Sequence, residues 1–161
     1  MKFVVDRMLG KLAKGLRMLG YDTIYYRGED VGPLIQLARQ EDRCILTRNT
    51  KLTQGKSDIA ILRVTEDNPI LQLRELIERG DISLNKEALF IRCLLCNNLL
   101  NEIPREEVVG KVPDFILYQQ KRFFQCPQCQ RIYWQGSHQQ HMQKKVSELL
   151  ARTQSQATNT K

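Results

Sequence analysis

The chain has 161 residues, of which 42% are hydrophobic, and it carries a formal net charge of +7 at pH 7. This length suits one ordinary domain or a domain with a small appendage, and the apolar share allows a buried core. No stretch of the sequence approaches the roughly 18 consecutive apolar residues of a membrane span, which argues against a membrane protein. The apolar start is too short for a signal peptide, so we expect a cytoplasmic protein. The basic excess favours a polyanionic partner, and a solvated surface explains it equally well.

The first twenty residues predict a buried strand, a carboxylate and a helix. Residues 3–5 are apolar, and Asp6 ends that run. The apolar positions that follow share one helical face, with a period of 3.6 residues: Met8, Leu9, Leu12, Ala13, Leu16 and Leu19. The basic positions share the opposite face: Arg7, Lys11, Lys14 and Arg17. Gly20 suits the left-handed residue that ends such a helix.

The next seventy residues alternate between strand and helix patterns. Further strands are predicted at residues 22–26, 43–47 and 59–64, further helices begin at Pro33 and Pro69, and residues 48–57 form a polar loop. This alternation is typical of an α/β fold in which helices flank a mostly parallel sheet. Cys44 lies within the third strand, where we expect it to act as a small buried hydrophobic residue.

The composition changes near residues 85–92, which divides the chain into a first domain, residues 1–88, and a cysteine-containing module, residues 89–152. The module is expected to end in a helix with these apolar positions: Met142, Val146, Leu149 and Leu150. Ser137 suits the N-cap of this helix, and His138 and His141 fit its start better than a metal or catalytic role. Residues 153–161 have almost nothing to bury and are expected to be disordered.

Two CxxC pairs dominate the second half of the chain: Cys93 with Cys96, and Cys126 with Cys129. Four thiolates with this pairing suit one tetrahedral Zn²⁺ and leave no open position, so a structural zinc site is predicted. Iron in the same geometry and a redox role are the alternatives. The 29 residues between the pairs exceed the usual 15 to 20, and we expect an additional strand or helix there, such as residues 114–119.

Polar side chains follow three of the predicted strands. Asp6 follows the first, Glu29 and Asp30 follow the second, and Arg48 and Asn49 follow the third. Because the carboxyl ends of parallel strands share one edge of a sheet, these groups are expected to converge. Converging carboxylates favour Mg²⁺ or Mn²⁺, the ions that most often assist phosphodiester cleavage.

Basic residues near this edge suit a phosphate backbone: Arg7, Lys11 and Arg48. Each polar residue also has an ordinary structural explanation. Asp6 and Asp30 are each placed to cap a helix, and Asn49 is common in turns.

Several motifs together resemble the Mut-seven C-terminal RNase family, a PIN-like nuclease domain followed by a zinc ribbon. The resemblance extends from residue 2 to about residue 148. It rests on Phe3 to Ala13, Leu16 to Thr23, Arg43 to Arg48, Gln72 to Glu75, Arg92 to Asn97 and Cys126 to His138.

This resemblance implies a PIN-type fold, a carboxylate-bound Mg²⁺ or Mn²⁺ and cleavage of RNA. Asp6 and Asp30 match the first and second metal carboxylates of the family. Asn49 stands where the family has its third acidic residue, which implies weaker binding of the ion. Asp58 is an alternative third carboxylate.

Basic and aromatic residues flank the second cysteine pair, as in proteins that stack bases and bind phosphates. The residues expected to contact RNA are Arg7, Lys11, Lys14, Arg48, Lys121, Arg122, Arg131 and Trp134. The aromatic residues also suit a small ribbon core, which is the preferred interpretation for Phe124 and Tyr133; both interpretations stay open for Trp134.

The sequence therefore predicts a metal-dependent ribonuclease whose ribbon helps to bind RNA. Two alternatives remain. The first is an RNA-binding protein of the same fold that cleaves weakly or not at all, because Asn49 replaces a carboxylate. The second is a protein-interaction module, the weakest hypothesis because the sequence contains no long exposed apolar helix.

Overall fold

The computed structural model describes residues 1–54, 58–134, 136, 144 and 148, and the chain divides into two compact units, Met1–Asn97 and Asn98–Lys161. Ser137, His138 and His141, the apolar positions of the predicted C-terminal helix and the tail, residues 153–161, lie outside the described residues. Among the helices of the described part, none has the length and apolar character needed to cross a membrane.

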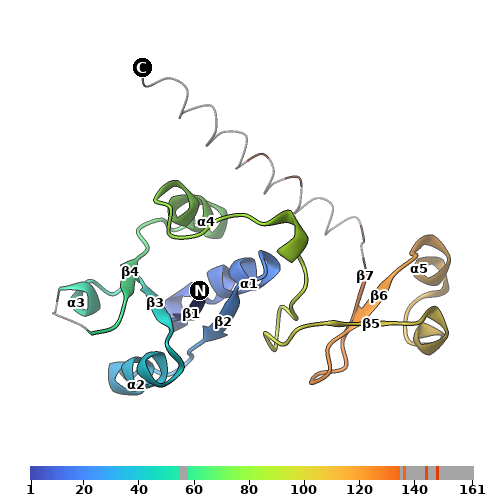
Figure 1. Ribbon diagram of the computed structural model, residues 1–161, viewed down its shortest axis with the longest axis horizontal. Helices are drawn as coiled ribbons and strands as arrows, with labels where there is room; N and C mark the ends of the chain where they lie inside the picture. The colour runs from blue at the N-terminus through green and yellow to red at the C-terminus, as the bar shows by residue number, and fades with distance from the viewer. Residues whose placement is uncertain (55–57, 135, 137–143, 145–147, 149–161) are drawn as a thin grey trace. The chain divides into compact units, whose positions relative to one another are not determined.

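A four-stranded parallel sheet forms the centre of the first unit, with the strand order β2-β1-β3-β4 (Figure 1). Its strands are β1 (Lys2–Val5), β2 (Asp22–Tyr25), β3 (Cys44–Thr47) and β4 (Ile61–Arg63). In the register, Val4 of β1 lies between Ile24 of β2 and Ile45 of β3. Strands β1 and β3 are almost wholly buried, as expected of strands covered on both faces. The predicted α/β class is confirmed.

Helices cover both faces of this sheet (Figure 1). They are α1 (Gly10–Met18), α2 (Val31–Glu41), α3 (Thr50–Thr53) and α4 (Pro69–Glu78), with short 3₁₀ turns η1 (Arg7–Leu9) and η2 (Lys86–Ala88). Helices α1 and α4 pack against each other, whereas Leu34 and Ala38 of α2 share a buried cluster with Val4 and Ile45. Helix α2 begins two residues before Pro33, and α3 occupies part of the segment predicted as a loop.

The first helix differs from its prediction at Met8 and Arg17. Residues 7–9 form a 3₁₀ turn before the α-helix begins at Gly10, so Met8 leaves the buried face and is 62% exposed. Arg17 was expected among the exposed basic residues but is buried, because its guanidinium binds backbone carbonyl groups. Gly20 has a φ of +92°, which confirms the predicted left-handed helix end.

The second unit contains a three-stranded antiparallel sheet, with the order β5-β6-β7. Its elements are β5 (Asn101–Ile103), η3 (Arg105–Val108), α5 (Asp114–Gln119), β6 (Phe123–Gln125) and β7 (Ile132–Trp134). Helix α5 is the additional element predicted between the cysteine pairs. The small core contains Phe123 and Val108, both fully buried, whereas Phe124, Tyr133 and Trp134 are half-buried. Phe124 therefore contributes less to the core than the sequence suggested.

The strand order determines where the first unit has an open crevice. The chain leaves β1 toward β2 on one side and leaves β3 toward β4 on the other, so the order reverses between β1 and β3. Loops that diverge in this way leave a crevice at the carboxyl ends of the two strands, where open α/β sheets bind ligands. Asp6 and residues 48–49 follow these two strands directly.

Candidate active site and metal cluster

The carboxylate of Asp6 is held in one orientation at the end of β1. Its Oδ1 accepts a hydrogen bond from the backbone N–H of Met8 at 2.9 Å and caps turn η1. Asp6 therefore has the capping role that was one of its two interpretations from the sequence. Its Oδ2 accepts a hydrogen bond from the Thr47 hydroxyl. Asp6 is only 7% exposed, so these contacts hold a buried carboxylate at the crevice.

Thr47 connects Asp6 to the third polar position of the site. Its fully buried hydroxyl donates to Asp6 and accepts a hydrogen bond from the backbone N–H of Asn49 at 2.9 Å. The Asn49 side chain caps α3, because its Oδ1 accepts from the backbone N–H of Lys51 at 3.0 Å. An amide oxygen has two lone pairs, so this cap leaves Asn49 one further acceptor position.

Asp30 occupies the N-cap position of α2 but makes no capping hydrogen bond with its side chain. The exposed carboxylate is therefore available for another partner. The Tyr26 hydroxyl donates to the backbone carbonyl of Asp30 at 3.0 Å, and the Tyr26 N–H donates to Val5 O at 2.9 Å. A Cβ at Gly28 would lie 2.3 Å from the Tyr26 hydroxyl, so any other residue at position 28 would require the end of the tyrosine side chain to shift.

Asp6, Asp30 and Asn49 line one pocket of about 320 Å³. The pocket wall also includes Glu29 and Arg48. At its rim Arg7 pairs with Glu29 at 2.5 Å, and Arg48 pairs with Asp67 at 2.5 Å. Both arginines that the sequence assigned to phosphate binding at this site are thus already neutralised by carboxylates.

Asp58, the alternative third carboxylate, lines a different pocket. It forms a two-point ion pair with Arg39, with both N–O distances at 2.9 Å. That pocket includes Lys2 and Cys44, the first residues of β1 and β3, and therefore lies at the amino edge of the sheet. Asp6 lies at the opposite, carboxyl edge, so Asp58 is not at the Asp6 pocket.

Two residues near the pocket were not identified from the sequence. Thr47 was named only as the end of a strand, because its hydrogen bond to Asp6 depends on the pairing of β1 with β3. Asp67 follows β4 at the same edge of the sheet and pairs with Arg48. Polar residues that follow parallel strands meet at the carboxyl edge of the sheet. The same rule, applied to the fourth strand, would have found Asp67.

The four cysteines come together, as predicted. The ligand atoms of Cys93, Cys96, Cys126 and Cys129 all lie within 4.8 Å of one another. Both pairs sit in turns of the same geometry: the N–H of Asn97 donates to Cys93 O at 2.9 Å, and that of Gln130 donates to Cys126 O at 3.0 Å. Asn97 and Gln130 both have positive φ, of 70° and 59°. The cluster can hold a metal ion with four sulfur ligands.

The first of these turns is fixed to the parallel-sheet unit by Arg17, Asn97 and Arg92. The Arg17 guanidinium donates to Leu94 O at 2.8 Å and to Leu95 O at 2.9 Å, and these residues separate Cys93 from Cys96. The Asn97 side-chain oxygen accepts a hydrogen bond from the backbone N–H of Thr23. The Arg92 guanidinium donates to the carbonyl oxygens of Gly20 and Asn97. Burial lowers the pKa of the Arg17 guanidinium below its usual value.

The predicted RNA-contacting residues of the second unit have different surroundings. Arg122 pairs with Glu102 at 2.7 Å and lies 5.2 Å from the centre of the Phe124 ring. Lys121 is exposed. Arg131 and Trp134 line a pocket of about 570 Å³ together with Lys111. A cation beside an aromatic ring is a common arrangement for binding single-stranded nucleic acid.

Comparison with known proteins identifies the family. The family model described as the Mut7-C RNAse domain matches residues 1–146. A human protein, "Exonuclease mut-7 homolog", is 30% identical over 101 residues, which make up 60% of this chain. The chain spans only 12% of that relative's length, and no solved structure gives a significant match. The match over residues 1–146 shows that the chain belongs to the Mut7-C RNAse domain family.

Proposed function

We propose that this protein is a divalent-metal-dependent ribonuclease that hydrolyses RNA phosphodiester bonds at the Asp6 pocket. The observation that carries the proposal is the convergence of Asp6, Asp30 and Asn49 in one pocket at the carboxyl ends of the strands. Membership of a ribonuclease domain family supports both the reaction and RNA as the substrate.

The donor groups of the pocket fit Mg²⁺ or Mn²⁺, because both ions prefer oxygen ligands. Asp6 and Asp30 would hold the ion, and the amide oxygen of Asn49 would complete the protein ligands. Such an ion, when bound, supplies Lewis-acid stabilisation of the phosphate charge and of the attacking water.

The side chains have distinct roles in this proposal. Thr47 and the Met8 N–H hold the Asp6 carboxylate in the orientation needed for binding. Asp30 is available, because it makes no capping bond, and Tyr26 fixes the backbone that carries it. The paired arginines at the rim, Arg7 and Arg48, exchange carboxylate partners for phosphate when RNA binds.

The four-cysteine cluster is proposed as a structural Zn²⁺ site. Four thiolates leave the ion no open position, which supports a role in folding the module and not in the reaction. We assign residues 1–88 to the nuclease domain, residues 89–152 to the zinc ribbon with its helix, and residues 153–161 to a tail. Thiolate ligands persist in a reducing compartment, which supports the cytoplasm as the location.

The ribbon is proposed to help bind RNA. Arg131, Trp134 and Lys111 line one pocket, so a base can stack on the indole ring while its phosphate meets a cation. Lys121 and Arg122 lie on the same module, although Arg122 must first leave Glu102.

A second candidate function is RNA binding with little or no cleavage. Asn49 favours it, because this residue brings no charge to the ion and its oxygen already caps α3. Metal affinity falls when a carboxylate is replaced by a neutral amide, since the attraction between opposite charges is lost.

The test is cleavage of a labelled single-stranded RNA by the full chain with Mg²⁺, with Mn²⁺ and without an added ion. Asp30→Asn removes one proposed ligand, and Asp58→Asn removes a carboxylate from the opposite edge as the matched control. The proposal expects metal-dependent cleavage that Asp30→Asn abolishes and Asp58→Asn leaves unchanged. RNA binding without cleavage under every condition would favour the second candidate, and equal effects of both variants would contradict the assigned site.

A further inference from the structure

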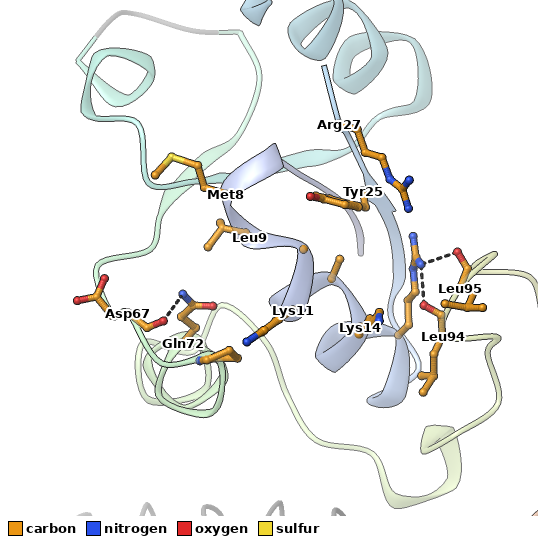
Figure 2. A pocket seen from close by; sticks show the side chains of 14 residues that line it. Met8, Leu9, Lys11, Lys14, Tyr25, Arg27, Asp67, Gln72, Leu94 and Leu95 are labelled. Carbon is orange, nitrogen blue, oxygen red and sulfur yellow. Dashed lines mark hydrogen bonds between the residues drawn. The ribbon is translucent and has the colours of Figure 1, made fainter. Parts of the chain in front are cut away.

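A second pocket lies beside the proposed active site, wholly within the first unit. Its volume is about 620 Å³, compared with about 320 Å³ for the Asp6 pocket. Its walls come from the first turns of α1, the end of β2, the start of α4 and the loop between Cys93 and Cys96 (Figure 2). Met8 lines both pockets, so the two sites adjoin at this side chain.

Three exposed cations of this pocket differ from those around Asp6, because they have no acidic partner among the described residues. Lys11, Lys14 and Arg27 line the pocket, and within the described residues none of them forms an ion pair. Arg7 and Arg48, in contrast, are paired with Glu29 and Asp67. Asp67 also lines the larger pocket, but its charge is matched by Arg48. Three unmatched positive charges in one concavity favour a bound anion.

Apolar surface lies within the same concavity. Met8 is 62% exposed and Leu95 is 47% exposed, although both are large hydrophobic residues. The Tyr25 ring faces the Arg27 guanidinium, whose carbon lies 5.4 Å from the ring centre (Figure 2). A pocket with both cations and apolar side chains suits a ligand that has a charged part and a flat apolar part.

The wall that carries Leu94 and Leu95 is fixed in place. Arg17 donates to both of their carbonyl oxygens, and dashed lines mark these bonds at Leu94 and Leu95 in Figure 2. The Nε of Arg17 also donates to Thr23 O at 2.9 Å. The buried Arg17 therefore shapes the pocket, whereas the exposed cations remain free to bind. This arrangement explains why one basic residue of α1 is buried while Lys11 and Lys14 are exposed.

We infer that the larger pocket binds an unpaired nucleotide of the RNA next to the bond that is cut. Its phosphate would lie on Lys11, Lys14 and Arg27, and its base would contact Met8, Tyr25 or Leu95. A base is accessible in this way only in a single strand, because a duplex keeps its bases stacked inside. This inference rests on the proposed function and extends it by naming single-stranded RNA and the site that selects it.

The first experiment measures RNA affinity without turnover. The full-length, zinc-loaded protein is titrated with a short fluorescent oligouridylate without added Mg²⁺ or Mn²⁺, at several salt concentrations. The pocket variant is Lys11→Gln/Lys14→Gln/Arg27→Gln. The matched variant, Lys2→Gln/Arg63→Gln/Lys86→Gln, removes the same charge from exposed residues outside this pocket.

The pocket variant is expected to bind at least about tenfold more weakly. The slope of log affinity against log salt concentration should become shallower by about 0.7, the contribution of one phosphate contact on a single strand. The matched variant should change both quantities much less. Equal losses in the two variants would overturn the inference, because the affinity would then depend only on net charge. A duplex that binds as tightly as the single strand would also overturn it.

A second variant tests the base contact without changing any charge. Met8→Ala should weaken binding of the oligouridylate and leave binding of inorganic polyphosphate, which has no bases, unchanged. Leu71→Ala is the control, because Leu71 is also exposed (40%) but does not line this pocket. No difference between Met8→Ala and Leu71→Ala with the oligouridylate would show that no base lies against Met8.

Cleavage kinetics separate this inference from the proposed function. If both hold, the pocket variant raises KM with little change in kcat, whereas Asp30→Asn abolishes cleavage without weakening binding. Normal cleavage by Asp30→Asn would contradict the proposed active site. The RNA affinities alone would then show whether the larger pocket binds a nucleotide. Normal RNA affinity of the pocket variant would contradict nucleotide binding in the larger pocket, whatever the cleavage rate of Asp30→Asn.

Discussion

The Thr47 hydroxyl donates a hydrogen bond to Asp6 Oδ2 while it accepts one from the Asn49 N–H at 2.9 Å. Asp6 directly follows β1, and Thr47 is the last residue of the neighbouring strand β3, so one buried hydroxyl joins both sides of the crevice. We therefore propose Thr47 as a positioning residue, because it contacts Asp6 and would act on the reaction through that carboxylate.

Thr47→Val should lower cleavage by about 10- to 100-fold, the usual effect of removing a group that orients a metal ligand. The valine keeps the shape but leaves Asp6 Oδ2 and the Asn49 N–H without this partner. The measurement is the Mn²⁺ concentration needed for half-maximal cleavage, which should rise. Thr47→Ser keeps the hydroxyl and should restore both values; a serine variant as impaired as the valine variant would argue against the positioning role.

Asn49→Asp should strengthen metal binding and increase cleavage. The new carboxylate adds a charge to the proposed site, and aspartate caps a helix as well as asparagine does, so α3 should be retained. Titration of Mn²⁺ against both proteins checks the affinity, and the RNA assay checks the rate. If Asn49→Asp changes neither while Asp30→Asn still abolishes cleavage, Asn49 is not a ligand.

Asp22 links three parts of the first unit and should make its stability depend on pH. Burial raises the pKa of Asp22, but hydrogen bonds from Arg43 and Asn97 and nearby positive charges outweigh it, so the pKa lies below its usual value. The charged carboxylate therefore stabilises the fold above about pH 4, and this contribution is lost as the pH falls through the lowered pKa.

Asp22→Asn should therefore lower the free energy of unfolding by about 1.5–3 kcal/mol at pH 7. The difference between variant and wild type should shrink in acid, below about pH 4. Urea unfolding at both pH values measures it. A difference that is the same at both pH values would show that the charge of Asp22 does not contribute.

Removal of one cysteine ligand should release the metal ion and destabilise the second cysteine turn. Cys126→Ser should purify without zinc and melt at a lower temperature, because structural zinc binding contributes directly to folding. Metal analysis and a thermal melt check both effects. Cys44→Ala is the control: burial raises the pKa of the Cys44 thiol to about 11, so this residue is not a thiolate and the variant should keep its zinc. Loss of zinc from Cys44→Ala as well would contradict the assigned ligand set.

Much of the fold could be predicted from local patterns. The apolar run before Asp6 indicated β1, and the pattern around Pro69 indicated α4 with both of its bounds. Residues 114–119 were expected to form an extra element, and they form α5. These segments follow the sequence because propensity and hydrophobic period agree there.

The errors arise where long-range contacts decide the outcome. Arg17 has the period of an exposed basic residue, yet it is buried because backbone carbonyl groups of Leu94 and Leu95 bind it. Met8 is exposed because the chain first turns as a 3₁₀ helix capped by Asp6. No pattern within α1 contains either contact.

The candidate site was predictable in its members but not in its contacts. Asp6, Asp30 and Asn49 follow strands that the sequence indicated, and their convergence in one pocket agrees with the rule for parallel sheets. Which of them caps a helix depends on side-chain geometry: Asp6 and Asn49 do, and Asp30 does not. The pairing of Arg48 with Asp67 likewise required the position of β4.

Cleavage of single-stranded RNA by the Asp6→Asn variant shows whether the Asp6 carboxylate is needed for the reaction. The asparagine can still accept the Met8 N–H, so the turn should be retained, while the ligand charge at the end of β1 is removed. We predict that the wild type cleaves only with added Mg²⁺ or Mn²⁺ and that Asp6→Asn binds the RNA normally but does not cut it. Cleavage by Asp6→Asn at the wild-type rate, or wild-type cleavage without a divalent ion, would contradict metal-dependent cleavage at Asp6.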